Sequence, residues 1–282
     1  MPEKNKNERK LSLTTGQLTD QIQLLLGRVP NELEFEIFES CFNNESVCAS
    51  IINEYIKQNP TPEFIELTPE ISGILRTESF ELDESSDNTA SSKLIIRLIN
   101  KTLKKFARPV VFMNSYIFEN IKPKAAKAML NNIINGTSLV SNTIGIPTFQ
   151  VETTFAINNK NITRINGLSL GILEKKSELQ SQTKLKNGDK IFLLGKTKPK
   201  GTKSLKNENN LLLSASYHKR VHDAIIALLQ ENSILKIEPV DKNGIFSSLL
   251  KLVKNEEKGL NINISNLKLN LKETNDNSWI KS

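Results

Sequence analysis

The chain has two histidines, His218 and His222, and their type and spacing could do chemistry. At positions i and i+4 they would share one face of a helix, where two imidazoles can ligate one metal ion. The intervening residues Lys219, Arg220 and Val221 supply no carboxylate of the kind that accompanies such a pair in zinc proteases. We therefore interpret both histidines as residues of a polar helix face beside Val221 and expect no metal site.

The two cysteines of the chain, Cys41 and Cys48, are spaced to lie on one face of a helix. Free cysteine behaves as a small apolar side chain, and intracellular proteins keep it reduced. We expect both to be core residues of a reduced, cytosolic protein.

A lysine-rich segment spans residues 184–206, and only Asp189 opposes its charge. Its lysines are Lys184, Lys186, Lys190, Lys196, Lys198, Lys200, Lys203 and Lys206. Such a segment forms either a solvated surface or a surface that binds anions or nucleic acid. Residues 196–206 contain no aromatic side chain on which bases could stack. We therefore favour the solvated surface, with a phosphate-bearing ligand as the alternative.

The composition describes a globular protein with a core. The chain has 282 residues, of which 38% are hydrophobic and 24% charged, and its formal net charge is +7. No apolar run reaches the roughly 20 residues that cross a bilayer. The first ten residues are charged and lack the apolar segment of a secretory signal. These features predict a cytoplasmic protein without a membrane partner.

The elements that would position a site centre on residues 141–173. The pattern predicts the end of a helix, a turn at 145–147, and two strands at 148–157 and 162–173 joined by an Asn-rich hairpin. Gly167 and Gly171 in the second strand are positions at which the backbone can be approached closely. Upstream, the pattern predicts helices at 93–106 and 125–140 around a buried strand at 110–118.

The C-terminal third alternates between strand and helix patterns. We expect strands at 190–195, 234–240 and 260–271, with helices at 217–231 and 244–255. This order is typical of an α/β module. The predicted division is a helical region and linker at 1–62, a first domain at 63–183 and a C-terminal α/β domain at 184–282.

Several short segments resemble one family in the same order along the chain. Residues 142–155 resemble "GNxIGIPTVGGExxF" of the PurL-type formylglycinamide ribonucleotide amidotransferases (FGAM synthases), which are PurM-like (AIR-synthase-related) ATP-dependent enzymes. Residues 18–38 resemble "ILGREPNxxELxMF", and Glu78-Ser79 the start of "ESHNHPS". Residues 107–115 resemble "GARPxxxxNS", and residues 188–201 "GDxxxxxGxxTGRDG". The resemblance implies an α/β (α+β) fold with a PurM-like N-terminal domain, whose sheet could pair into a dimeric barrel, and a shortened C-terminal α/β domain.

The resemblance also assigns candidate residues for nucleotide binding by family position: Glu78, Glu152, Asp189 and Gly201. Other parts of the family pattern are missing. Residues 80–83 replace the family's His-Asn-His-Pro, Gln150 and Val151 replace two glycines, and Lys200 replaces an acidic residue. These changes remove residue types that hold metal-bound phosphates, because phosphoryl transfer needs cations and close backbone N–H groups.

Three hypotheses follow. The first is a catalytically degraded PurL/PurM-like protein that acts as a binding or partner subunit, with no cofactor. It would form a homodimer, or a heterodimer with a PurM-like relative, through the strands at 149–157 and 162–173. The second is a divergent ATP-dependent FGAM-synthase-like ligase of purine biosynthesis, or a fragment of one, using ATP and Mg²⁺. The third, anion or nucleic-acid binding through residues 184–206, is the least favoured.

Overall fold

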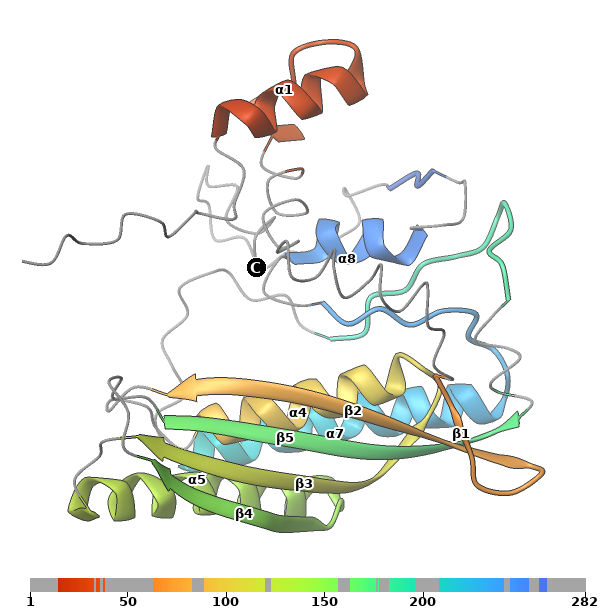
Figure 1. The fold of residues 1–282 in the computed structure, drawn as a ribbon. Coiled ribbons are helices and arrows are strands. Elements are labelled where there is room, and N and C mark those ends of the chain that lie inside the picture. Colours follow the sequence, from red (N-terminus) through yellow and green to blue (C-terminus); the bar gives the residue numbers. More distant parts are fainter. Residues whose placement is uncertain are drawn as a thin grey trace, which may run out of the picture. The chain divides into compact units, whose positions relative to one another are not determined.

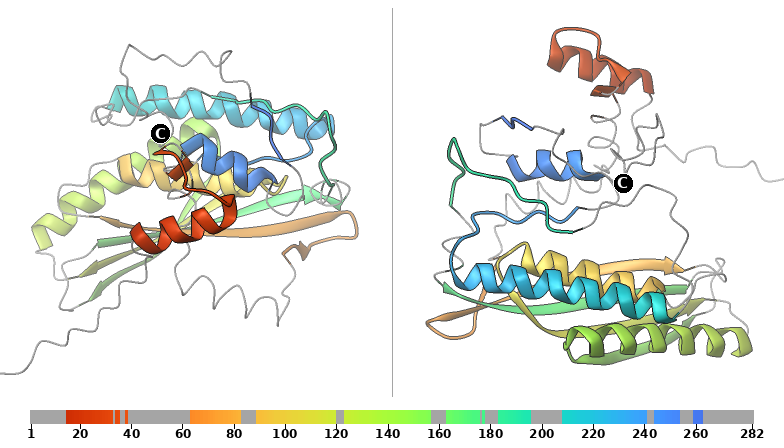
Figure 2. Two further views of the ribbon diagram at one scale, coloured as in Figure 1. Left: turned by 90° about the horizontal axis from the view of Figure 1, so that it is seen from above. Right: turned by 180° about the vertical axis from the view of Figure 1, so that it is seen from behind.

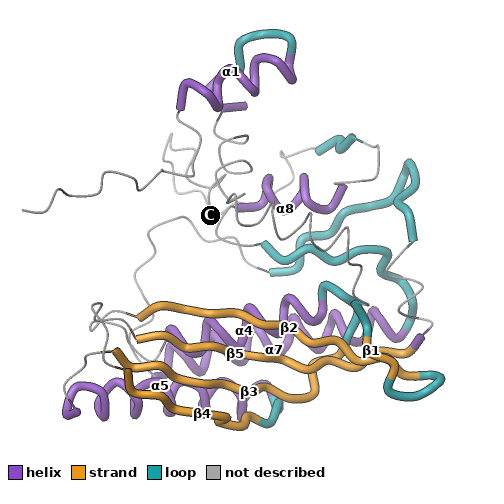
Figure 3. The backbone as a smooth tube through the Cα atoms, viewed as in Figure 1, coloured by secondary structure: helices purple, strands orange, loops and turns teal. Residues whose placement is uncertain are grey.

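A computed structural model gives the fold of the chain. It describes residues 15–32, 34, 35, 38, 63–82, 89–119, 123–156, 163–175, 177, 183–195, 208–240, 244–253 and 259–262 (Figure 3). Several sequence predictions lie outside these residues: Cys41, Cys48, Gly201, the hairpin turn at 158–161 and most of the predicted strand at 260–271.

The chain divides into two compact units. One contains helix α1 (Thr15–Leu26) and helix α8 (Gly244–Val253). The other, the sheet unit, contains the β-sheet and helices α4 (Thr89–Leu103), α5 (Pro123–Ile144) and α7 (Glu208–Gln230). Helix α7 packs on α4 and α5, so it belongs with the sheet although it follows residue 184. The predicted domain boundaries themselves stay a prediction.

The sheet has five strands in the order β1-β2-β5-β3-β4 (Figure 1). They are β1 (Ile65–Glu66), β2 (Ile71–Leu82), β3 (Arg108–Glu119), β4 (Thr148–Ala156) and β5 (Thr163–Glu174). All neighbours are antiparallel except β3 and β4, which are parallel and connected through α5.

The two strands predicted at 148–157 and 162–173 exist, but the prediction that they pair with each other as a hairpin is wrong. Strand β5 lies between β2 and β3, whereas β4 pairs with β3 alone. The crossover through α5 brings the chain back parallel to β3, so β4 fills one side of β3 and leaves the other side to β5.

The helices α4, α5 and α7 lie on one face of the sheet (Figure 2). The main core forms where α4 and α5 pack on the strands, and side chains of α7 complete it. The largest fully buried side chains of this core are Tyr116, Phe118, Leu94, Ile95, Leu98, Leu103, Ile133 and Ile165.

Helix α4 approaches β5 closely where β5 has glycine. A Cβ at Gly167 would lie 2.6 Å from Leu98 Cδ1, and a Cβ at Gly171 would lie 2.2 Å from Thr102 Cγ2. Real Cβ atoms do not come so close, so the prediction of a close approach at these two glycines is confirmed.

Burial alternates along β5 because successive side chains point to opposite faces. From Thr163 to Leu173 every odd-numbered residue is buried under the helices, and every even-numbered residue is half-buried on the other face. No described helix of the sheet unit covers that second face, which we call the open face.

Two of the strands predicted in the C-terminal third do not form. Residues 190–195 and 234–240 have no strand structure and no ladder partner among the described residues. The apolar pattern of Ile191 to Leu194 is typical of a strand, but a strand forms only when another backbone satisfies its N–H and C=O groups. The helix expected at 217–231 begins nine residues earlier, at Glu208.

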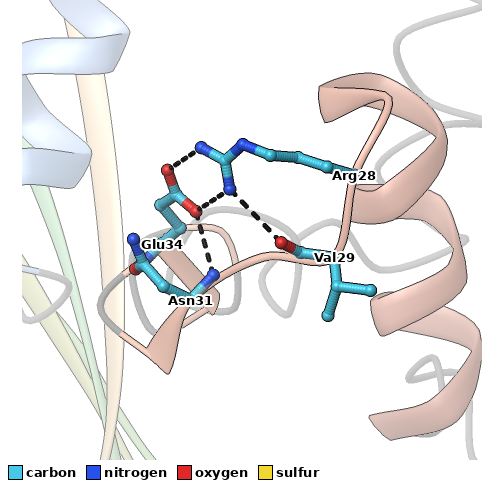
Figure 4. Close-up of polar contacts among 4 residues, drawn as sticks. All are labelled: Arg28, Val29, Asn31 and Glu34. Carbon is cyan, nitrogen blue, oxygen red and sulfur yellow. Dashed lines mark hydrogen bonds and ion pairs between the residues drawn. The ribbon is translucent and has the colours of Figure 1, made fainter.

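In the other unit, Asn31 and Glu34, which have the spacing of a capping box in the sequence, form one (Figure 4). The Asn31 side chain accepts from the Glu34 N–H at 2.8 Å, and the Glu34 carboxylate accepts from the Asn31 N–H at 2.9 Å. Arg28 donates two further bonds to this carboxylate, and these contacts lower the pKa of Glu34 to about 2.

Among the described residues, no helix combines the length and apolar character that crossing a membrane requires.

The close approach of α4 to β5 gives a stability prediction. Gly171→Ala should lower the free energy of unfolding by about 2 kcal/mol, because the new methyl group overlaps Thr102 and Ala107. Urea denaturation followed by circular dichroism measures it. The matched control is Gly73→Ala in β2, where the nearest atoms belong to the exposed side chain of Leu67, which can move away. Equal losses in both variants would contradict the packing described here.

Candidate functional site

The first candidate residue, Glu78, lies on the helix-covered face of β2. Its carboxylate forms ion pairs with Lys101 and Arg97 of α4, the second at 3.7 Å. Arg97 also stacks over the ring of Phe80, 4.5 Å from its centroid. Lys101 also donates a hydrogen bond to the backbone carbonyl of Thr77, at 3.2 Å. Glu78 therefore joins β2 to α4, and both cations that face it belong to the same chain.

The residue after it, Ser79, faces the other way and starts a row of polar side chains across the open face. Its hydroxyl donates to Asn166 Oδ1 at 2.8 Å, and Asn166 Nδ2 donates to Ser115 Oγ at 3.4 Å. Ser115 pairs in register with Glu152 at a bulge between β3 and β4. We call Ser79, Asn166, Ser115 and Glu152 the polar row.

The polar row unites residues from three separate family-like segments. Ser79 follows Glu78, Ser115 ends the segment 107–115, and Glu152 lies in the segment 142–155. The sheet order β2-β5-β3-β4 makes them neighbours although they are far apart in sequence. Glu152 is exposed, and it has no ion pair among the described residues.

Sequence analysis missed Asn166, which bridges Ser79 and Ser115. The available signal was its position among Ile165, Gly167 and Leu168, where a polar residue interrupts a strand rich in apolar side chains. Such a residue on a strand indicates either solvent or a hydrogen-bonded neighbour on the same face. Only the order of the strands identifies that neighbour.

The rows on either side of the polar row differ in character. On one side, Thr77, Leu168, Met113 and Phe149 form a mainly apolar row in register across the same four strands. Beyond it, Leu75 pairs with Leu170. On the other side, Arg164 and Glu81 form an ion pair at 2.7 Å. The open face is therefore apolar toward one end and polar toward the other.

At the apolar end of the open face, large apolar side chains are highly exposed. Phe149 is 56% exposed and Leu75 is 44% exposed. Side chains of this kind gain roughly 1.5–3 kcal/mol each when they leave water completely. A partner that covered them would gain that free energy.

Asp189 stabilises a turn. Its carboxylate accepts from the backbone N–H of Lys186 at 2.6 Å, and its own N–H donates to the carbonyl of Lys186 at 3.3 Å. Gly188, between them, has a φ of 95°, which glycine adopts without strain. Asp189 is therefore engaged by its own loop, and Gly201, the fourth candidate, lies outside the described residues.

The lysine-rich segment is described only up to residue 195. Lys186 and Lys190 are exposed there, in line with a solvated surface, and Lys184 is exposed as well. The lysines from 196 to 206 lie outside the described residues, so anion binding by the whole segment stays a prediction.

The interpretation of His222 as a polar-face residue is wrong. It is 3% exposed, and its Nε2 lies 3.0 Å from Asn100 Oδ1 of α4. His218 lies one turn earlier, with ring centroids 6.0 Å apart, and is half-buried. His222 lies seven residues from both Ala215 and Leu229, so it shares the buried face of α7 with them and lies toward α4.

Neither the histidine pair nor the carboxylates form a metal centre within the described part of the chain, where no three His, Cys, Asp or Glu side chains gather. Glu78 and Glu152 lie on opposite faces of the sheet, and Asp189 is used by a turn. These three residues do not fit a shared Mg²⁺–phosphate site, which needs several oxygen ligands around one ion.

Comparison with family models finds no match. The chain is 21% identical over 192 residues to the PurL subunit of phosphoribosylformylglycinamidine synthase from Aquifex aeolicus, and 22% identical over 272 residues to that of Pelagibacter ubique. These matches cover 63% and 86% of this chain, but 26% and 36% of the relatives. The chain therefore spans well under half the length of the curated relatives it matches.

Solved structures of PurL from Thermotoga maritima have a similar fold. The complex with ADP superposes with a TM-score of 0.62 at 18% identity, and the complex with ATP with a TM-score of 0.58 at 17% identity. Each covers 85% of this chain and 39% or 40% of the PurL chain. The resemblance inferred from the short segments is thus confirmed: this chain has a PurL/PurM-like fold and is similar in sequence to the PurL subunits.

Proposed function

We propose that this chain is a catalytically degraded relative of PurL that acts as a partner subunit and pairs with a second copy of itself through the open face of its sheet. The observation that carries the proposal is the exposure of Phe149 and Leu75 on a face that no described helix of the sheet unit covers. Sheets normally bury one face and solvate the other, and the solvated face is then polar. Here the solvent-facing side carries apolar rows.

The polar end of the open face supports an oriented contact. The half-buried Arg164 is paired with the exposed Glu81, and Glu152 adds a further exposed carboxylate at the β4 side. Apolar side chains supply most of the free energy of association, whereas charged groups at the margin set the orientation. A face that is apolar at one end and charged at the other meets both conditions.

The ion pairs and hydrogen bonds of the candidate carboxylates support the proposed loss of catalysis. Glu78 is neutralised by Lys101 and Arg97, and Asp189 is held by a backbone N–H. A carboxylate that binds metal-held phosphates must be free to face the cation. These residues have structural tasks instead.

The second candidate function is an ATP-dependent carbon–nitrogen ligase of purine biosynthesis, or a part of one. Its support is the polar row, where Ser79, Ser115 and Glu152 come together from three family-like segments. PurL from Thermotoga maritima is known in complexes with ATP, ADP and FGAR. If this candidate holds, the polar row would contribute to binding a polar substrate, and ATP with Mg²⁺ would bind saturably.

A heterodimer with a PurM-like relative, such as a PurL subunit, is the alternative form of the first proposal. It needs the same open face and the same apolar rows. Mixing the two proteins distinguishes it from self-pairing.

Self-pairing gives a prediction on oligomeric state. Sedimentation velocity should detect a dimer whose population rises with protein concentration. Phe149→Asp should shift it to monomer, because a charge inside an apolar contact is costly to desolvate. The matched control is Ile134→Asp on α5, an exposed apolar residue of comparable type on the helix side, which should leave the dimer intact.

A monomer at every concentration would refute self-pairing, and a monomer that also fails to bind a PurL subunit would refute the partner role as a whole. A dimer that Phe149→Asp does not disturb would place the contact elsewhere.

The role of Glu78 separates the two candidate functions. If Glu78 is structural, Glu78→Gln should lower the free energy of unfolding by about 1 kcal/mol, because it leaves Lys101 and Arg97 without their 17%-exposed partner. Glu81→Gln, which breaks the more exposed pair with Arg164, should change it by a few tenths at most, roughly the value of a surface pair. Urea denaturation measures both.

Isothermal titration with ATP and Mg²⁺ completes the test on the unmodified protein and on Glu78→Gln. Saturable binding that Glu78→Gln abolishes without loss of stability would overturn the partner role and favour the ligase.

A further inference from the structure

The buried histidine of α7 has no part in either candidate function. His222 lies on the apolar stripe by which α7 joins the core, between Ala215 and Leu229. Leu211 and Ala215 belong to the main core cluster, and Ile225 and Ile226 pack against it. A titratable ring thus occupies a buried position with apolar side chains two turns away on either side.

The hydrogen bond of His222 indicates which ring nitrogen carries the proton. Asn100 Oδ1, at 3.0 Å from Nε2, is an amide oxygen and can only accept, so the ring donates from Nε2. Nδ1 is buried and has no hydrogen-bond partner among the described residues. A neutral ring with an unprotonated Nδ1 is compatible with this site, since a second proton would have no acceptor.

We infer that His222 is an acid-sensitive lock: while its ring is neutral it holds α7 on α4, and protonation at Nδ1 releases α7 from the sheet unit. The inference goes beyond the partner role, because it concerns the helix-covered side of the sheet rather than the open face.

The surroundings of His222 disfavour the charged ring. Burial is the largest cause that lowers its pKa from 6.5 to about 4, and the neighbouring His218 is a second, weaker cause of the same shift. Lys219 also lowers the pKa, and Asp223 opposes these effects in part.

Among the described residues, the helices packed on α7 offer no compensating negative charge to the ring. Helix α4 faces the ring with the neutral Asn100. Its Lys101 and Arg97 are paired with Glu78, and Lys104, just after the helix, is paired with Glu238. The charged residues of α5 are Lys124 and Lys127, and both are exposed.

The sign of the pH effect follows from this depressed pKa. Between about pH 6.5 and pH 4 the released helix binds a proton that the docked helix does not, so docking is complete at neutral pH and weakens as the pH falls. From these two pKa values, the equilibrium constant for release should rise by roughly 20-fold between about pH 7 and about pH 5.

The experiment is hydrogen exchange with mass spectrometry on the full chain at about pH 7 and about pH 5, with each rate divided by its intrinsic rate. Peptides from α7 should lose protection at the lower pH, whereas peptides from β3 and β5 should keep it. His222→Gln keeps an amide N–H that can donate to Asn100, and it should remove the pH dependence of α7. The control His218→Gln should retain most of it.

Asn100→Asp supplies an independent test if His222→Gln fails to fold. A carboxylate against the ring favours the imidazolium, so α7 of this variant should stay protected at about pH 5. Equal protection of α7 at both pH values in the unmodified protein would overturn the lock. So would a pH-dependent loss that persists unchanged in His222→Gln, or simultaneous loss in α7, β3 and β5, which would indicate global unfolding.

Discussion

The contact on which the rest of the sheet unit depends is that between α4 and β5. Side chains of α4, with Leu98 and Thr102 at the centre, occupy the space that Gly167 and Gly171 leave empty. Because β5 is the third of five strands in the sheet, this contact fixes α4 over the middle of the sheet. Helix α5 packs beside α4, and α7 packs on both. Helices thereby cover one face of the sheet, whereas no described helix of the sheet unit covers the other.

The division into two faces also decides what the candidate residues can do. Glu78 and Ser79 are neighbours in sequence, but the pleat directs one into ion pairs with α4 and the other into the polar row. The residue with a carboxylate is therefore withdrawn from the open face, while a hydroxyl is presented there. Together with the engaged Asp189, this distribution explains how a PurL-like fold can persist while its carboxylates serve structure.

Much of the fold could be predicted from local sequence patterns. The amphipathic stripe of α4, the apolar density of β3 and the glycines of β5 each have a period or a residue type that indicates their place. The pairing of β4 and β5 could not be predicted this way, because an Asn-rich connection is compatible with a hairpin and with a crossover alike. The segments 190–195 and 234–240 have strand patterns without strand structure, since a pattern does not supply a partner.

The candidate site could be predicted only in part, because local patterns do not give the order of the strands. Glu78 and Glu152 could be selected by family position, but only the strand order shows that they lie on opposite faces and that Asn166 links Ser79 to Ser115. His222 was misassigned because its polar type and its pairing with His218 suggested a polar face, whereas Ala215 and Leu229, two turns away on either side, place it on the buried face.

The central claim is that the open face is covered in solution. Methyl NMR with a soluble paramagnetic agent tests it at two methionines: Met113, in the apolar row of the open face, and Met129, buried under the helices. The account predicts that the Met113 methyl signal is protected at high protein concentration and broadens on dilution, while that of Met129 stays protected throughout. A Met113 signal that the agent broadens equally at every concentration would contradict the claim.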